Sequence, residues 1–141
     1  PLGMMLELPS VVGIIRELAE EADFFSIGTN DFVQYMIGVD RTNEKVAHYY
    51  CPHHPSVLRS LAEMVRAVTA ENKDIAICGE MAHELEYISF LLGIGVRKIS
   101  VDPQFLPRLQ EKTGKRLKIF CTSGQPFMSG IPEIWIHGAK E

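Results

Sequence analysis

The 141-residue sequence predicts an α/β fold in which four strand–helix units follow one another and form one parallel sheet. Three observations lead to this fold. Short apolar runs alternate with longer segments whose apolar residues recur at helical spacing. The short runs are continuously apolar, as in strands that are covered on both faces. Glycine and proline separate the units, and no internal repeat is present.

The first half of the chain contains two such units, with strands expected at residues 3–8 and 24–27 and helices at residues 9–22 and 30–38. Pro9 ends the first strand and opens the first helix, in which Val12 and Ile15 lie on one face. Gly28 ends the second strand. Residues 39–54 are polar and aromatic without a period, so we expect a loop there.

The second half contains two further units, with strands expected at residues 74–78 and 98–101 and helices at residues 55–72, 84–92 and 103–112. Pro55 opens the longest helix, and Val65 belongs to its apolar face. Gly114 ends the last helix. Residues 117–141 contain glycine breakers and one strand-like run at 134–136, which predicts an irregular C-terminal extension.

Composition excludes several classes of protein. The net charge of −4 and the pI near 5.7 do not fit a nucleic-acid-binding surface, which is normally basic. No apolar run reaches the roughly 18 residues that span a bilayer, and the first residues lack the basic region of a secretory signal. Three cysteines at unrelated spacings predict a reducing, cytoplasmic environment. The chain is also shorter than a complete eight-stranded barrel, which needs about 250 residues.

Polar residues follow the predicted strands, where parallel β/α proteins carry their chemistry. Glu7 lies in an apolar run, so it is either a surface carboxylate on an edge strand or a ligand for a cation or substrate. Asn30 or Asp31 fits a helix N-cap, but Asp31 also offers a hard oxygen to a divalent cation. Arg41 is either a solvated loop charge or a phosphate or carboxylate ligand.

Cysteine and histidine are weaker signals. Cys78 ends a buried strand, where a thiol is usually an inert core residue, although at the mouth of a site it can donate a proton or act as a nucleophile. Cys51 beside His53 has no second pair to complete a zinc site. His83 is expected on the surface or in a loop, and Asp102 is expected to cap a helix.

Three segments resemble motifs of the phosphoenolpyruvate-utilising enzymes. These are residues 3–10 (GMMLELPS), 26–35 (SIGTNDFVQY) and 77–82 (ICGEMA), in the order in which the family has them. The tripeptide at residues 39–41 and the helix start at residues 54–58 are most similar to the phosphoenolpyruvate–protein phosphotransferase branch, which includes enzyme I of the bacterial sugar phosphotransferase system and its nitrogen-related paralogue. The resemblance covers residues 2–109.

The resemblance implies a role for each matching residue. Glu7 and Asp31 would bind the Mg²⁺ that bridges to phosphoenolpyruvate, and Asn30 and Asp31 would offer backbone amides to the substrate phosphate. Arg41 would hold the anionic groups of the substrate, and Cys78 would protonate the enolate as pyruvate forms. The phosphoryl group would pass to a histidine on another domain and then to the histidine phosphocarrier protein. The family also implies a homodimer.

The resemblance further implies that the chain is the C-terminal half of a (β/α)8 TIM-type barrel. Residues 1–116 would form this partial phosphoenolpyruvate-binding barrel, and residues 117–141 lie outside it. Two substrate-binding arginines of the family, and the domain with the phosphorylated histidine, have no counterpart in this sequence. His83 also stands where the family usually has glycine. We therefore expect a fragment that does not transfer phosphoryl groups alone.

Two alternatives remain open. The chain is a non-catalytic assembly module if the unpaired edges and uncovered face of a half barrel associate with a second copy. It is a domain of the pyruvate phosphate dikinase or phosphoenolpyruvate synthase type if the weaker similarity to those enzymes is the relevant one.

Overall fold

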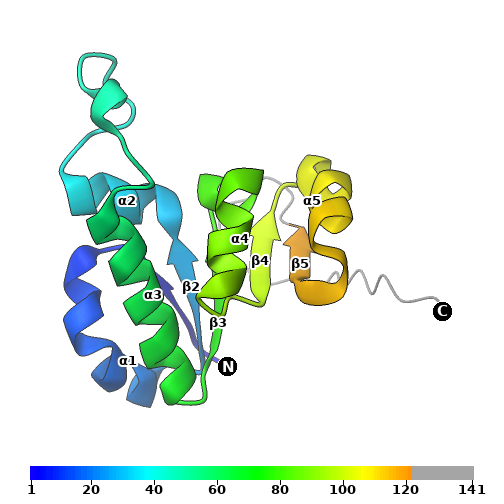
Figure 1. The fold of residues 1–141 in the computed structure, drawn as a ribbon. Coiled ribbons are helices and arrows are strands. Elements are labelled where there is room, and N and C mark those ends of the chain that lie inside the picture. The colour runs from blue at the N-terminus through cyan, green and yellow to red at the C-terminus, as the bar shows by residue number, and fades with distance from the viewer. Residues whose placement is uncertain (122–141) are drawn as a thin grey trace.

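The computed structural model describes residues 1–121, which form a five-stranded parallel sheet with its strands in chain order (Figure 1). The strands are β1 (Gly3–Leu6), β2 (Phe24–Gly28), β3 (Asp74–Cys78), β4 (Lys98–Val101) and β5 (Lys118–Cys121). Each strand pairs in parallel with the next. The arrangement is a partial β/α barrel, because every strand is connected to its neighbour by a helical crossover.

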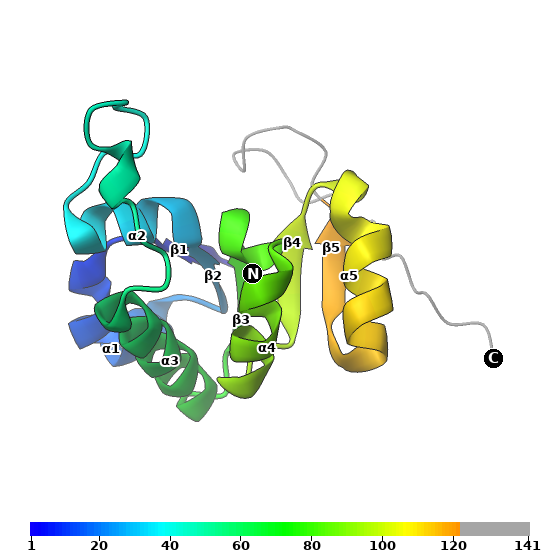
Figure 2. The ribbon, with the colours of Figure 1, turned by 45° about the horizontal axis from the view of Figure 1, so that its top comes forward.

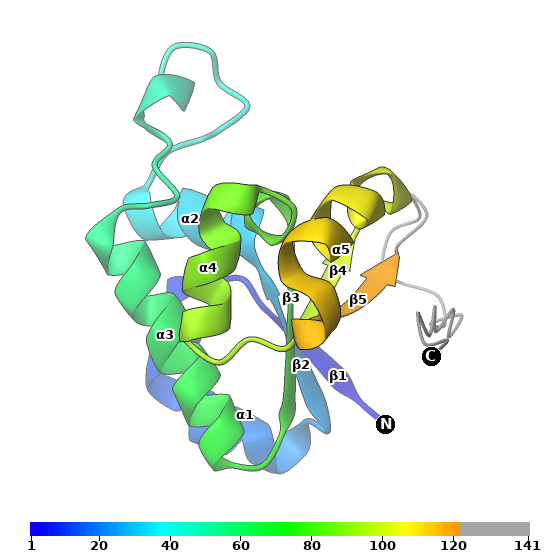
Figure 3. The same ribbon diagram turned by 45° about the vertical axis from the view of Figure 1, so that its right-hand side comes forward.

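Most of the α-helices follow one another along one side of the sheet, while the helix that comes directly after β2 lies at the carboxyl end of that strand (Figures 2 and 3). The α-helices are α1 (Ile15–Glu21), α2 (Thr29–Ile37), α3 (Pro55–Ala70), α4 (Leu85–Gly93) and α5 (Leu106–Thr113). Short 3-10 helices lie between them at η1 (Pro9–Ile14), η2 (Ala47–Tyr49), η3 (Glu80–Ala82), η4 (Pro103–Phe105) and η5 (Gly114–Arg116). Among residues 1–121, none of the helices is both long enough and apolar enough to cross a membrane.

The core lies between the sheet and its helices. On β2 and β3, the side chains of Phe25, Ile27 and Ile77 are buried on the helix-covered face. The longest helix, α3, contributes the apolar face that the sequence predicts, with Val57, Leu61, Met64, Val65 and Val68 all buried. The opposite face of the sheet is mixed: it carries the buried Ser26 and, on the same side, the larger Phe24 and Met5. The sheet therefore has one face packed by helices and one face on which polar and apolar side chains alternate.

The four predicted strands are all present, with β1 two residues shorter than expected. The first predicted helix begins as the 3-10 helix η1 and becomes α-helical only at Ile15, because Gly13 and the β-branched Val11 and Val12 disfavour an α-helix.

The strand β5 lies in the segment expected to be irregular, so the sequence did not reveal it. Its four residues have no clear period, and they become a strand by pairing with β4, from Lys98 beside Lys118 to Val101 beside Cys121. The strand-like run at residues 134–136 lies outside the described residues.

Replacing Ile77 by alanine should destabilise the fold strongly. Its side chain on β3 is fully buried, so the truncation leaves a cavity that costs about 2–5 kcal/mol in the free energy of unfolding. Urea denaturation followed by circular dichroism measures this value. Ile14→Ala is the matched control, since Ile14 is 47% exposed and its loss should change the free energy by less than about 0.5 kcal/mol. Equal effects of both substitutions would contradict the placement of Ile77 in the core.

Candidate functional site at the carboxyl edge of the sheet

Parallel pairing brings the residues after β1, β2 and β3 to one edge of the sheet. Leu6 lies beside Ile27 in the register of β1 and β2, and Gly28 lies beside Cys78 in that of β2 and β3. Glu7 therefore leaves β1 next to Gly28. The geometry places Glu7, the start of α2 and Cys78 side by side, as the sequence analysis expected.

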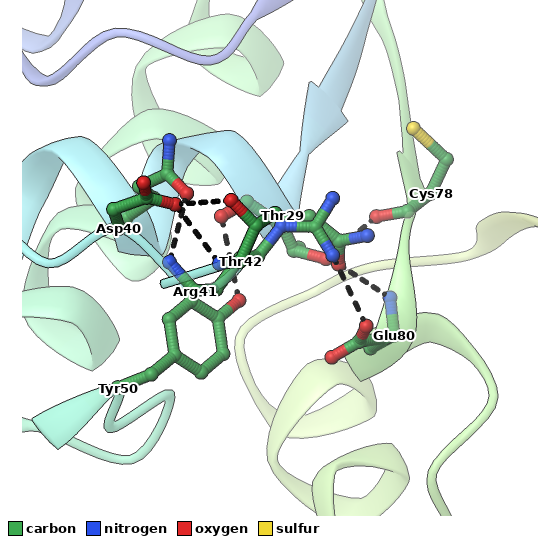
Figure 4. Close-up of polar contacts among 9 residues, drawn as sticks. Thr29, Asp40, Arg41, Thr42, Tyr50, Cys78 and Glu80 are labelled. Atoms are coloured by element: carbon green, nitrogen blue, oxygen red, sulfur yellow. Dashed lines mark hydrogen bonds and ion pairs between the residues drawn. The ribbon is translucent and has the colours of Figure 1, made fainter. Parts of the chain in front are cut away.

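The turn after β3 is hydrogen-bonded to the first residues of α2 (Figure 4). The hydroxyl of Thr29 donates to the carbonyl oxygen of Cys78 at 2.7 Å, and the backbone N–H of Glu80 donates to Oδ1 of Asn30 at 2.8 Å. Between them Gly79 adopts a φ of +92°. A Cβ at Gly79 would lie 2.4 Å from Oγ1 of Thr29 and 2.8 Å from Oδ1 of Asn30. Only glycine permits this approach.

The prediction that Asn30 or Asp31 caps α2 is wrong. The helix begins at Thr29, its N-cap is Gly28, and no side chain accepts a hydrogen bond at that position. The side chain of Asn30 instead reaches the next strand–helix turn, where it accepts from Glu80. Helix capping is a local interaction, and here a tertiary hydrogen bond takes its place.

Capping by Asp102 is confirmed, because its carboxylate accepts from the backbone N–H of Gln104 at 3.0 Å. His54 caps α3 by accepting from the backbone N–H of Ser56 at 3.3 Å, a role that the sequence analysis did not assign. His83 lies in the loop after β3, where its ring stacks on that of Phe105 with centroids 3.9 Å apart. These three residues serve local structure.

Cys78 is the last residue of β3, and its thiol contacts the neighbouring strand β2. Its thiol donates to the carbonyl oxygen of Ile27 at 3.4 Å, and the Ser26 hydroxyl donates to its sulfur at 3.7 Å. Burial raises the pKa of the Cys78 thiol, the hydrogen bond from Ser26 opposes this, and the charges of Glu7 and Asp31 raise the pKa further. The thiol is therefore protonated at neutral pH, which suits a proton donor better than a nucleophile.

Glu7 and Asp31 thus act on the same thiol from the ends of β1 and β2. The Oε2 atom of Glu7 lies only 3.3 Å from where a Cβ on Gly28 would be, so the absence of a side chain there leaves room for the carboxylate. Within residues 1–121, no group of three or more His, Cys, Asp or Glu side chains could hold a metal. Two carboxylates fit Mg²⁺, which commonly takes one or two from protein and other oxygens from substrate and water.

The loop at residues 39–54 brings Arg41 to the same edge (Figure 4). Its guanidinium lies 3.3 Å from the carboxylate of Glu80, and its backbone N–H donates to the side chain of Gln34 at 3.1 Å. The hydroxyl of Tyr50 donates to the carbonyl oxygen of Asn30 at 3.3 Å. Burial raises the pKa of Tyr50 to about 12, and the charge of Glu80 adds to the shift.

The sequence analysis did not single out Glu80, Tyr50 or Thr29. Glu80 was visible only as part of the ICGEMA motif, and its ion pair with Arg41 joins residues 39 positions apart. Tyr50 lay in a loop without a period, where a sequence does not show which residue turns inward.

A partial β/α barrel with carboxylates, a thiol and a guanidinium at its carboxyl edge defines a ligand-binding domain of the barrel class. The chain belongs to the family described as PEP-utilising enzyme, PEP-binding domain, which its residues 1–117 match.

The curated relatives are much longer than this chain. The phosphoenolpyruvate-protein phosphotransferase of Bacillus subtilis (strain 168) is 44% identical over 100 residues, which cover 71% of this chain and 18% of that protein. A multiphosphoryl transfer protein of Escherichia coli O6:H1 is 42% identical over 111 residues, covering 79% of this chain and 13% of its own length. The chain therefore corresponds to less than a fifth of either relative.

Among solved structures, an HpcH/HpaI aldolase from Desulfitobacterium hafniense DCB-2 matches 79% of this chain and 35% of its own, with a TM-score of 0.47 and 19% sequence identity. A likeness at that level says nothing about function.

Replacing Gly79 by alanine should force the turn after β3 away from the start of α2 and destabilise the fold. The new Cβ would collide with Thr29 and Asn30, and the positive φ adds backbone strain, so we expect a loss of at least about 2 kcal/mol in the free energy of unfolding. Gly38→Ala is the matched control, because Gly38 has a φ of +66° but nothing within 4 Å of the added Cβ, so it should cost only about 1 kcal/mol. Chemical denaturation measures both. A Gly79→Ala variant as stable as the control would contradict the close approach.

The Glu7 carboxylate should slow the alkylation of Cys78. Because its charge raises the pKa of the thiol, Glu7→Gln lowers that pKa, and a larger fraction of thiolate reacts with iodoacetamide at pH 8.5. We expect the rate for the Cys78 peptide, followed by mass spectrometry, to rise about threefold. Glu63→Gln, on the exposed side of α3, should leave the rate unchanged. An unchanged rate in Glu7→Gln would show that the two groups do not interact.

Proposed function

We propose that the carboxyl edge of this sheet binds phosphoenolpyruvate together with Mg²⁺, and that it supplies this site to a phosphoenolpyruvate–protein phosphotransferase. One observation carries the proposal. In a chain that belongs to the PEP-binding family, Glu7, Asp31, Arg41 and Cys78 all lie on the elements that meet at this edge. The combination of two carboxylates, a guanidinium and a protonated thiol matches what breakdown of an enol phosphate requires.

Glu7 and Asp31 would hold the cation, because both supply carboxylate oxygens near Cys78. Bound Mg²⁺ supplies charge neutralisation for the phosphate and for the negative charge that develops on the enolate. The first backbone N–H groups of α2, including those of Asn30 and Asp31, have no acceptor within the helix and would bind the phosphate oxygens. Arg41 would hold the remaining anionic group of the substrate with its planar guanidinium.

Cys78 would deliver the proton. When the bond between phosphorus and the enol oxygen breaks, the phosphoryl group leaves and the electron pair stays on the enolate of pyruvate. The methylene carbon of this enolate then takes the proton from the Cys78 thiol. The pKa shift of Cys78 supports this role, since burial and the neighbouring carboxylates keep the proton on sulfur until a stronger base forms beside it.

The phosphoryl group would pass to a histidine on another domain and from there to the histidine phosphocarrier protein. This part of the proposal depends on the phosphotransferase relatives, which extend far beyond the segment that they share with this chain. None of the five histidines lies in the sequence context of the phosphorylated histidine of the family. We therefore propose that residues 1–141 bind substrate in the cytoplasm but do not complete the transfer alone.

An assembly role is the second candidate, and the sheet order favours it. Strands β1 and β5 are the two edges of the described sheet, and edge strands offer unpaired backbone groups to a second chain. In this case two copies would form a homodimer and the carboxyl edge would bind no ligand.

Calorimetric titration with phosphoenolpyruvate and Mg²⁺ separates the two functions. We expect binding heat that requires Mg²⁺, and we expect Glu7→Gln and Asp31→Asn each to weaken binding at least tenfold, because each removes one carboxylate from the cation. Asp23→Asn is the matched control, since Asp23 precedes β2 at the opposite edge of the sheet and should leave binding unchanged. An absence of heat with the parent chain would reject substrate binding and favour assembly.

A further inference from the structure

A chain of contacts joins Asn30, Glu80, Arg41 and Tyr50 at the candidate site. The Oδ1 atom of Asn30 accepts from the backbone N–H of Glu80, and its carbonyl oxygen accepts from the hydroxyl of Tyr50. Glu80 in turn pairs with Arg41. Because Arg41 and Tyr50 both belong to the 39–54 loop, this loop is fastened twice to one residue of α2, once directly and once through Glu80.

The contact between Glu80 and Arg41 engages one corner of the guanidinium. Only the NH1 atom of Arg41 reaches Oε1 of Glu80, at 3.3 Å, and this is the one polar contact of the Arg41 side chain within residues 1–121. A guanidinium has five N–H donors in a planar fork. Most of those on Arg41 therefore remain available to an anion, while the contact with Glu80 restricts the direction in which the fork points.

The side chains of Arg41 and Glu80 are both partly exposed. Arg41 is 34% exposed and Glu80 is 47% exposed, so the pair lies at the mouth of the site rather than in the core. Glu80 is itself held in place, because its backbone follows the constrained Gly79 and is bonded to Asn30. A fixed carboxylate beside a long, flexible side chain reduces the freedom that the side chain loses when a ligand binds.

We propose that Glu80 is a positioning residue for Arg41, which aims the guanidinium at the anionic substrate without touching the substrate itself. This inference rests on the proposed function, in which Arg41 binds an anionic group of phosphoenolpyruvate. The geometry indicates that Glu80 positions Arg41 and does not compete with the substrate for it. Glu80 contacts only one corner of the guanidinium, so the other N–H donors remain free. If Glu80 instead occupied the place of the anion, removing its charge would strengthen binding.

The test combines binding with a double-mutant cycle. In Glu80→Gln we expect phosphoenolpyruvate, titrated with Mg²⁺, to bind about fivefold more weakly, the size of effect that one partly exposed ion pair can have. In an Arg41→Gln background the same change should shift the Kd by less than about twofold, because the residue that Glu80 positions is gone. Tighter binding in Glu80→Gln, or an equal loss in both backgrounds, would overturn the proposal.

Glu84→Gln is the matched control, since it removes the same charge four residues further along from an exposed side chain. It should change neither the Kd nor the dynamics of Arg41. This control separates a direct contact from the general effect of negative charge at the site.

Nuclear magnetic resonance gives a readout that does not depend on ligand. The heteronuclear NOE of the Arg41 Nε–H group should indicate an ordered side chain in the parent and in Glu84→Gln, and a mobile one in Glu80→Gln. A mobile Arg41 in the parent would overturn the positioning role even if substrate binds. Failure of the parent to bind phosphoenolpyruvate, with Arg41 still ordered by Glu80, would instead reject the proposed function.

Discussion

The arrangement of the candidate site depends on one close approach, between the turn after β3 and the first residues of α2. Gly79 makes it possible, because its positive φ and missing side chain let Thr29 and Asn30 bond to the backbone of Cys78 and Glu80. This contact places the thiol beside β2 and directs Glu80 toward the 39–54 loop. Two strand–helix units that are neighbours in the sheet are thereby joined at the edge where the polar groups gather.

Electrostatics links the groups at this edge to one another. Glu7 and Asp31 raise the pKa of Cys78, so the carboxylates suited to a cation also help to keep a proton on the thiol. Glu80 offsets the charge of Arg41 at the mouth of the site and also raises the pKa of Tyr50. A substitution at one of these residues therefore also changes the electrostatic environment of its neighbours, so the effects of substitutions at this edge are not additive.

Much of the fold could be predicted because its signals are local. The apolar runs of β1 to β4, the face of α3 and the breakers Pro9 and Gly28 belong to single segments of the sequence. The strand β5 escaped prediction because its residues become a strand only by pairing with β4. The capping of α2 by Asn30 was the wrong expectation, since the local preference of asparagine yields here to a bond with Glu80, fifty positions away.

For the site, the amino-acid sequence by itself determined which groups lie at or just after the end of each strand, Glu7, Asp31 and Cys78 among them, and the order of motifs that indicates the phosphoenolpyruvate-utilising family. Only the tertiary structure decided that Arg41 pairs with Glu80, and that Tyr50 turns inward to Asn30. The physical reason is that strand periodicity and turn residues act over a few positions, whereas ion pairs between loops depend on where the folded chain brings distant segments together.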